Sequence, residues 1–265
     1  MLPITPIRDA IFQFRLQNYY PSAQKHCAVQ KKILILHEFL IPYTKMKVIN
    51  LSQQPSLLNQ YLKEMRSVDV QKDSMRFRRN IERIGEIMAV EISKNLTYSV
   101  EQVQTPLAVA EMQVPQDKVV LGTLLRAGLP MHQGFLNMFD KAENAFISAY
   151  RKETIGRRGE MQIEIVSEYL AAPSIEGKTL ILVDPMLATG LSMEVAYKAL
   201  LSHGTPKDVH VACLFGTPQA INYLQETMPE NATLWCAVVD PMLNEKKYIV
   251  PGLGDAGDLC FGEKL

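Results

Sequence analysis

The chain of 265 residues is poor in the features that mark several classes of protein. Its four cysteines show no CxxC spacing, so neither a dithiol redox motif nor a zinc site of that type is expected. Cys213 and Cys236 fall within apolar runs, which indicates buried free thiols in a reducing compartment. No apolar run is long enough to cross a bilayer, and the N-terminus does not have the layout of a secretory signal. These absences predict a cytoplasmic protein with no membrane partner.

A surplus of charge of one sign is also absent, because 28 basic and 28 acidic residues give zero formal net charge. This balance argues against a general nucleic-acid or membrane-surface binder, but it leaves room for a local anion pocket. The five histidines are scattered, and no cluster of His, Cys and carboxylates suggests a transition metal. What the chain does have is 47% hydrophobic residues, enough for the core of an α/β enzyme with extra elements.

Glycine is missing from residues 1–45, which mix aromatic residues with four prolines and show no sustained period. We predict that Met46 is the natural start, that residues 46–265 form the domain, and that residues 1–45 are an upstream extension. The alternative, a real extra helix that packs on a partner subunit, stays open. No internal repeat or low-complexity segment is present.

Strands and helices alternate along the predicted domain. Residues 47–51, 118–125, 144–150, 180–183, 208–215 and 233–239 are expected to be strands, and helices are expected at 56–66, 74–94, 129–139, 189–201 and 219–228. The alternating residues 161–169 predict a β-arm with one wet face. The order predicts an α/β fold with a mostly parallel sheet flanked by helices. Ligands are then expected at the carboxyl ends of the strands.

The stretch from Leu180 to Ser192 combines four features within thirteen residues. A buried strand ends at Val183, and Asp184 follows it at the edge where open α/β sheets bind ligands. Thr189, Gly190 and Ser192 then open a helix, whose free N–H groups and positive dipole end suit a phosphate. Taken alone, the stretch is also compatible with the nucleotide-binding turn of another α/β enzyme or with a plain strand-to-helix connection.

Two segments carry a resemblance to a known family. Asp184-Pro-Met-Leu-Ala-Thr-Gly resembles the phosphoribosyl-diphosphate loop of the uracil phosphoribosyltransferases, and Tyr248-Ile-Val-Pro-Gly-Leu-Gly-Asp-Ala-Gly-Asp258 resembles their uracil-recognition segment. Two matches in the right order are much harder to produce by chance than one. The resemblance runs from about Met46 to the C-terminus, and it implies the type I phosphoribosyltransferase fold with a β-arm and a small C-terminal hood over the base site.

The resemblance implies that the first segment binds 5-phosphoribosyl 1-diphosphate (PRPP). The chemistry agrees, since backbone N–H groups and hydroxyls suit the 5-phosphate and Asp184 suits the ribose hydroxyls. The implied PRPP-binding residues are Asp184, Pro185, Met186, Leu187, Ala188, Thr189, Gly190, Leu191 and Ser192. Members of the family often have a second glycine where this chain has Leu191. A leucine at positive φ would be strained, whereas a leucine that offers only its N–H is harmless, and we expect the harmless case.

Two arginines match positions that the family uses at the diphosphate. Arg126 lies in Leu-Arg-Ala-Gly and Arg151 in Tyr-Arg-Lys. A guanidinium fork fits phosphate oxygens and stays charged, and fixed cations at a leaving diphosphate act mainly on the transition state. Arg157 and Arg158 are further candidates, although a solvated tip of the arm is the favoured interpretation of both.

The second segment is rich in glycine and carries Pro251, so its backbone can approach a flat ring closely. By resemblance, Ile249, Gly254 and Ala256 contact uracil, together with Asp255, which also faces PRPP and its metal. Arg126, Arg151, Asp184 and Asp255 are the implied catalytic residues. No strong general base stands out, and positioning with charge stabilisation is expected to supply most of the rate.

Mg²⁺ is the expected cofactor, because diphosphates are handled as metal complexes with few protein ligands and several waters. No direct protein ligand is assigned. The resemblance further implies activation by GTP and a homo-oligomer, either a dimer or a tetramer, with no nucleic-acid partner.

The sequence therefore predicts an enzyme that converts uracil and PRPP to UMP and diphosphate in pyrimidine salvage. Two rivals stay open at this point. One is another base specificity on the same fold, and the other is a non-catalytic RNA-binding regulator of a pyrimidine operon. Balanced charge and the lack of an obvious basic stripe count against the regulator.

Overall fold

A sheet of eight strands runs through the computed structural model of the chain, which describes residues 46–155 and 161–263. The strand order is β1 (Lys47–Asn50), β10 (Ala232–Val239), β9 (Asp208–Gly216), β7 (Thr179–Val183), β4 (Val119–Leu124), β5 (Glu143–Ile155) and β6 (Met161–Ala171), and β8 (Met186–Leu187) also pairs with β9. All neighbours are parallel except β5 and β6. The predicted mostly parallel sheet is confirmed.

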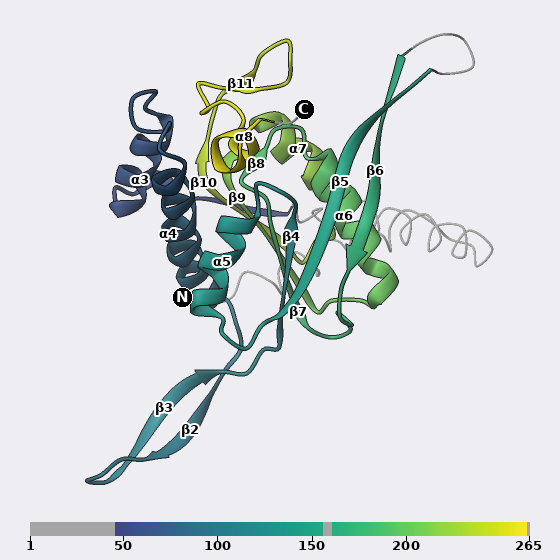
Figure 1. Ribbon diagram of the computed structural model, residues 1–265. Helices are drawn as coiled ribbons and strands as arrows, with labels where there is room; N and C mark the ends of the chain where they lie inside the picture. Colours follow the sequence, from purple (N-terminus) through teal and green to yellow (C-terminus); the bar gives the residue numbers. More distant parts are fainter. Residues whose placement is uncertain (1–45, 156–160, 264–265) are drawn as a thin grey trace, which may run out of the picture. The chain divides into compact units, whose positions relative to one another are not determined.

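Helices cover both faces of this sheet (Figure 1). The helices α3 (Leu57–Arg66), α4 (Ser74–Ser93) and α5 (Leu129–Met138) share a buried cluster with one face, and α6 (Leu191–Leu200) and α7 (Pro218–Thr227) share another with the opposite face. Strand β7 contributes to both clusters: Ile181 and Val183 belong to the first, Leu180 and Leu182 to the second. This strand is therefore buried on both sides, as its continuous apolar sequence predicts.

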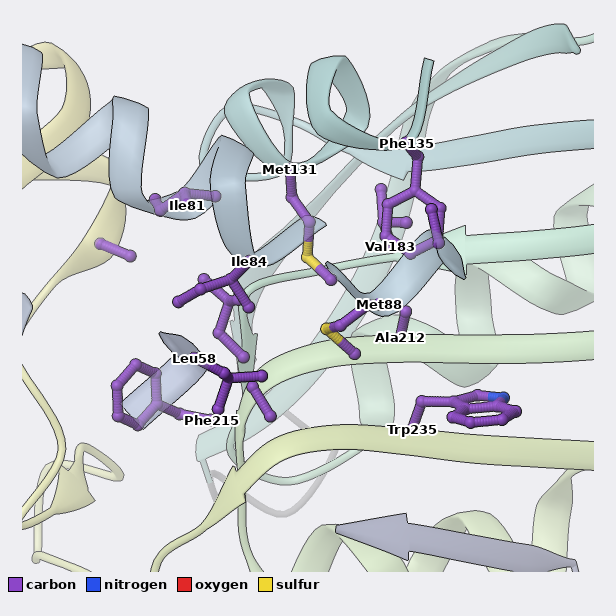
Figure 2. Close-up of a cluster of buried hydrophobic side chains, with 14 of the residues drawn as sticks. Leu58, Ile81, Ile84, Met88, Met131, Phe135, Val183, Ala212, Phe215 and Trp235 are labelled. Atoms are coloured by element: carbon purple, nitrogen blue, oxygen red, sulfur yellow. The ribbon is translucent and has the colours of Figure 1, made fainter. Parts of the chain in front are cut away.

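The predicted apolar stripe of α4 is confirmed. Ile81, Ile84, Met88 and Ile92 are fully buried, and Figure 2 shows the first three among Leu58, Met131 and Phe215. The helix begins where the side chain of Asp73 accepts a hydrogen bond from the N–H of Arg76 at 3.0 Å. Its charged residues lie on the other faces in partly exposed ion pairs such as Arg79–Glu82, which add little to stability.

Two features of the fold differ from the sequence-based expectation. The hairpin of β2 (Tyr98–Gln104) and β3 (Val109–Pro115) was not predicted, and Figure 1 shows it projecting from the rest of the domain. All seven residues of β2 are exposed, so the strand has no buried face and no alternating pattern to reveal it. Strand β5 also continues to Ile155 instead of ending near Tyr150, because it pairs with β6 from Phe146 to Ile155.

The carboxyl ends of the parallel strands meet at one edge of the sheet, and the C-terminal part of the chain lies there (Figure 1). It consists of β11 (Met242–Leu243), the antiparallel β12 (Ile249–Val250) and the short helix α8 (Ala256–Phe261). We call this part the hood. Among the described residues, no helix is both long and apolar enough to span a membrane. The expectations for residues 1–45 lie outside the described residues.

Candidate active site

A cavity of about 510 Å³ opens at this edge of the sheet, beneath the hood. Three segments far apart in the chain line it: the turn after β4, the loop after β7 and the hood itself. The lining residues are Leu124, Leu125, Arg126, Ala127, Asp184, Met186, Ala188, Ser192, Lys246, Lys247, Tyr248, Ile249, Gly254, Asp255, Ala256 and Gly257. The structure thus brings both resemblance-bearing segments and Arg126 to one cavity.

The loop after β7, residues 184–190, is hydrogen-bonded along its length to neighbouring elements. The N–H of Asp184 donates to the carbonyl of Ala212 at 3.1 Å, and the carbonyl of Pro185 accepts from the N–H of Phe215 at 3.0 Å. Further on, the Thr217 hydroxyl donates to the carbonyl of Ala188 at 2.7 Å. These bonds attach the loop to β9 and to the start of α7, so its path is determined before any ligand binds.

Gly190 turns the loop into helix α6. Its φ of 85° lies in the left-handed region, and a Cβ placed on it would meet the Tyr223 ring at 3.0 Å. Leu191 is the first helical residue, and among the described non-glycine residues only Lys247 has a positive φ. Leu191 is therefore unstrained, and its harmlessness to PRPP binding stays a prediction. No side chain caps this helix, which leaves its first N–H groups to a ligand.

Asp184 lines the cavity from the carboxyl end of β7. One of its oxygens accepts a hydrogen bond from the N–H of Met186 at 3.2 Å. Burial outweighs this bond and raises the pKa of Asp184 to about 6. A carboxyl group with such a pKa is ionised at neutral pH, but burial destabilises its charged form. Hydroxyl groups of a ligand that donate hydrogen bonds to it would stabilise that charged form.

Arg126 follows β4 across a cis peptide bond from Leu125. Its Nη2 lies 3.3 Å from an oxygen of Asp258 and donates to the carbonyl of Gly262 at 3.4 Å. These long contacts join the turn after β4 to the hood, and the side chain keeps 39% of its surface exposed. The guanidinium at the cavity wall is therefore only loosely engaged, and it can still bind an anion.

The hood contributes Ile249, Gly254, Asp255 and Ala256 to the wall. Asp255 caps α8, because one of its oxygens accepts from the N–H of Asp258 at 3.0 Å. That bond orients the carboxyl group at the edge of the cavity. Gly254 has a φ of 98°, and an added Cβ would meet no atom within 4 Å, so the backbone there is open to a flat ligand.

Sequence reasoning missed Lys246 and Lys247 in the wall, and it assigned no role to Tyr248, the first residue of the recognised segment. They belong to the turn between β11 and β12, which Asn244 closes: its side-chain oxygen accepts from the N–H of Tyr248, and its carbonyl accepts from the N–H of Lys247, both at 2.9 Å. The signal in the sequence was the position of two lysines directly before the recognised segment. Their charge adds to that of Arg126 at the cavity mouth.

Not every expected residue lies in the wall. Within the loop after β7 and the start of α6, Met186, Ala188 and Ser192 line the cavity with Asp184. Pro185, Leu187 and Gly190 are buried, and Thr189 and Leu191 are half-buried outside the lining. Arg151 lies inside β5 opposite Ile165, not at a strand end. The side chain of Arg151, like Arg157 and Arg158, lies outside the part of the chain that the structure describes.

Two carboxylates, Asp184 and Asp255, are the hard oxygen donors of the cavity. In residues 46–155 and 161–263, no group of three or more His, Cys, Asp and Glu side chains comes together as a metal site. Mg²⁺ needs few protein ligands, since it keeps several waters and binds substrate phosphates. The donor set therefore suits a Mg²⁺ ion that arrives with a diphosphate, and it does not suit a tightly held transition metal.

A family model and the curated relatives of this chain point to one family. The family model described as uracil phosphoribosyltransferase matches residues 51–263. A uracil phosphoribosyltransferase of Porphyromonas gingivalis is 58% identical over 220 residues, which cover 83% of this chain and 100% of that protein. One from Pyrococcus furiosus is 36% identical over 207 residues, or 77% and 85% of the two chains. The solved structure of the AQ2163 protein of Aquifex aeolicus superposes on this chain with a TM-score of 0.69 at 27% sequence identity. The superposition covers 81% of this chain and 98% of that protein.

Proposed function

Since the chain belongs to the uracil phosphoribosyltransferase family, we propose that the cavity beneath the hood is its active site. The enzyme converts uracil and PRPP to UMP and diphosphate in pyrimidine salvage. One observation carries the assignment of the site: the turn after β4, the loop after β7 and the hood, which carry the family's motifs, all line this single cavity.

The ribose 5-phosphate end of PRPP is assigned to the start of α6. Its uncapped N–H groups and the Ser192 hydroxyl offer donors, and the positive end of the helix dipole favours an anion. Asp184 accepts hydrogen bonds from the ribose hydroxyls in this arrangement, which relieves the cost of its burial. The remaining loop residues hold the backbone in place.

The diphosphate is assigned to the cationic side of the cavity. Arg126 provides a planar fork for its oxygens, and Lys246 and Lys247 add charge at the mouth. Arg151 is proposed as a second fork from β5. Fixed cations stabilise the charge that grows on the leaving group as the bond from C1 opens, so they act more on the transition state than on bound PRPP.

Uracil is assigned to the backbone of Ile249, Gly254 and Ala256. Its edge presents two carbonyls and an N–H, which backbone N–H and C=O groups can pair without a charged side chain. N1 of uracil then attacks C1 of the sugar while diphosphate leaves, and the N1 proton passes to solvent or to the leaving group. Holding both substrates in line supplies most of the rate, because the cavity offers no strong general base.

Mg²⁺ is proposed as the cofactor, with Asp255 and Asp184 as the side chains that orient it at the diphosphate. When bound, the ion neutralises charge on the diphosphate and makes it a better leaving group. An assay of UMP formation with and without Mg²⁺ tests this assignment, and equal rates after chelation would contradict it.

Base specificity is tested with the same assay. Turnover of uracil is compared with that of hypoxanthine, adenine and orotate at saturating PRPP, and only uracil is expected to yield a nucleotide. A rate with uracil no higher than with the other bases would refute the function. Measurement of RNA binding at physiological salt addresses the regulator, for which no affinity is expected.

We also propose that the enzyme is a homo-oligomer, either a dimer or a tetramer. The β2–β3 hairpin exposes Val100, Leu107, Val109 and Met112, and a two-stranded hairpin is marginally stable alone. Sedimentation analysis should give a multiple of the 29.9 kDa chain mass. Val100→Glu and Val109→Glu together should shift the protein towards monomer, and an unchanged mass would move the contact elsewhere.

Three further expectations are kept as proposals. Activation by GTP rests on family resemblance and is measured as a change in UMP formation at limiting PRPP. A cytoplasmic location is supported by the buried free thiols Cys213, Cys236 and Cys260, which suit a reducing compartment. The start at Met46 is tested by mass spectrometry of the protein from its own cell, where a peptide from residues 1–45 would contradict it.

A further inference from the structure

A partly buried ion pair lies behind the hood, outside the cavity wall. Arg66 is the last residue of α3, and Asp240 directly follows β10 with only 3% of its surface exposed. The contact has two points: Nη2 of Arg66 lies 2.6 Å from Oδ1 of Asp240, and Nη1 lies 2.9 Å from Oδ2. Neither residue lines the cavity, so neither touches the reacting groups.

Both members of the pair also hold the same residue of the hood. Nη1 of Arg66 donates to the carbonyl of Gly252 at 3.0 Å, and the N–H of Gly252 donates to Oδ2 of Asp240 at 2.9 Å. The backbone donor and acceptor of Gly252 are thus both bonded to the pair. A Cβ at Gly252 would lie 2.1 Å from the carbonyl oxygen of Ile249, so the chain turns too tightly there for another residue.

The pair is itself fixed on its other sides. The N–H of Asp240 donates to the carbonyl of Gly216 at 2.9 Å, and the guanidinium carbon of Arg66 lies 4.7 Å from the centre of the Phe215 ring. Strand β9 therefore supports both charges. Through these two side chains, the turn at Gly252 is fixed to the sheet and to α3. Its own short strand β12 does not have to hold it in place.

This connection matters because the hood has little regular structure. Its strand β12 is two residues long, and residues 251–255 lie outside any helix or strand. Ile249 and Gly254, which line the cavity, flank Gly252 at short range. A backbone that reads a base edge must stay close to its productive geometry, or binding has to supply the ordering entropy.

We propose that Arg66 and Asp240 are positioning residues for the base, which hold the backbone between Ile249 and Gly254 in the shape that pairs with the edge of uracil. This inference rests on the assignment of uracil to the hood. The inference assigns the two substrates to different supports. The pair affects the binding of the base, whereas PRPP is bound by the loop after β7 and by Arg126.

The test uses the full-length enzyme and two single variants, Asp240→Asn and Arg66→Lys. Asp240→Asn keeps the size but loses the charge, and Arg66→Lys keeps the charge but loses the fork. Displacement of a substrate by about 1 Å can lower the reaction rate roughly 100-fold. Because the displaced backbone would also pair less well with uracil, we expect the KM for uracil to rise about 10- to 100-fold. The KM for PRPP should stay within about twofold, since the pair meets the PRPP side only through Phe215 and Gly216, which are also held in the sheet as part of β9.

Discrimination between bases gives a second readout, which would stay unchanged if the pair had only a general structural role. A loosened backbone should accept thymine more readily, so the ratio of kcat/KM for uracil over thymine should fall in both variants. This ratio should fall less in Arg66→Lys than in Asp240→Asn, because the ammonium group of the introduced lysine still pairs with Asp240. If Asp240→Asn does not fold, Arg66→Lys carries the test, with its melting temperature measured beside the kinetics.

Arg79→Lys is the matched control. Arg79 pairs with Glu82 on α4 at 2.6 Å and lies away from the cavity, so both KM values should match those of the unmodified enzyme. Gly254→Ala is the positive control for the base site, because Gly254 lines the cavity at positive φ.

A rise of both KM values together in Asp240→Asn and Arg66→Lys would show a general structural role and overturn the inference. Unchanged KM for uracil in these variants, with a raised value in Gly254→Ala, would also overturn it while leaving the base site in place. Unchanged values in all three variants would instead refute the assignment of uracil to the hood.

Discussion

The two halves of the cavity are held in place by different means. The loop after β7 sits between a fully buried strand and a helix that follow each other in the chain, and its hydrogen bonds go to β9 and α7 close by. The turn at Gly252 in the hood is held by Arg66 and Asp240, and Arg66 is 186 residues away from the Gly252 carbonyl that it binds. One half is built from adjacent secondary structure, and the other from a distant charge pair.

This difference follows from the two ligands. A phosphate is recognised by a helix start, whose donors are produced by the helix itself. A pyrimidine edge requires donors and acceptors in a flat arrangement, which regular elements do not offer, so irregular backbone must be braced from outside. We therefore expect changes at the loop to act on PRPP, and changes behind the hood to act on uracil.

The largest effect is expected for Asp184→Asn. Loss of hydrogen bonds to a charged group costs roughly 1.5–3 kcal/mol, so kcat/KM for PRPP should fall about 100-fold. The KM for uracil at saturating PRPP should change little. Circular dichroism and thermal melting check that the variant is folded. A value of kcat/KM for PRPP close to that of the unmodified enzyme would remove Asp184 from the sugar site.

Arg126→Lys should have the next largest effect. The charge stays but the two-point contact with phosphate oxygens is lost, so kcat should fall about 10- to 100-fold, mainly in the transition state. The contact of Arg126 with Asp258 is long and partly exposed, so stability should barely change. Steady-state kinetics with both substrates and a melting curve test this. Full activity in the variant would mean that Arg126 does not clamp the diphosphate.

The raised pKa of Asp184 predicts a pH dependence on the PRPP side alone. Because burial raises that pKa to about 6, kcat/KM for PRPP should fall about tenfold per pH unit below about pH 6, as the carboxyl becomes protonated. Stability changes with pH in the opposite direction. Between the ordinary pKa of an aspartate, about 4, and pH 6 the folded state binds more protons than the unfolded state, so the free energy of unfolding decreases as pH rises through this range.

Asp184→Asn is the control for this profile. The variant should lose both the acidic limb in kcat/KM for PRPP and the matching slope in stability, and at neutral pH it should melt no lower than the unmodified enzyme. An acidic limb that persists in Asp184→Asn would assign the titration to another group.

The smallest effects are expected at the junction of the loop and α6. Gly190→Ala places a Cβ at positive φ, which costs about 1–2 kcal/mol of stability, and it should raise the KM for PRPP by several-fold. Leu191→Gly is the matched control. Leu191 already has helical geometry but is half-buried, so the change should cost about 1–2 kcal/mol through helix propensity and lost apolar burial, and it should leave the KM for PRPP unchanged. A large gain in PRPP affinity from Leu191→Gly would show that the leucine hinders the site.

Much of the fold was predictable because its elements have local causes. The stripe of Ile81, Ile84, Met88 and Ile92 predicts α4, and the doubly buried β7 is visible as a continuous apolar run. The β2–β3 hairpin was not predictable in this way, since an exposed ribbon has no buried face. The full length of β5 was missed because its end depends on pairing with β6 and not on its own sequence.

The same division applies to the site. Asp184, Gly190 and Ser192 are recognisable because strand, carboxylate and helix start succeed one another in the chain. Lys246 and Lys247 were overlooked, because two lysines in a turn are typical of any solvated surface. Only the folded chain shows that this turn meets the cavity, and that Asp258 faces Arg126.

The sequence by itself determined the alternation of strands and helices in the central sheet, the phosphate-type start of α6 and, through two separate motifs, the family, because each of these patterns is contained in a short stretch of the chain. The tertiary structure decided that Leu191 is unstrained, that burial raises the pKa of Asp184, and that Arg66 and Asp240 support Gly252. Backbone angles, solvent exclusion and contacts between distant residues arise only when the sheet assembles, and no local pattern encodes them.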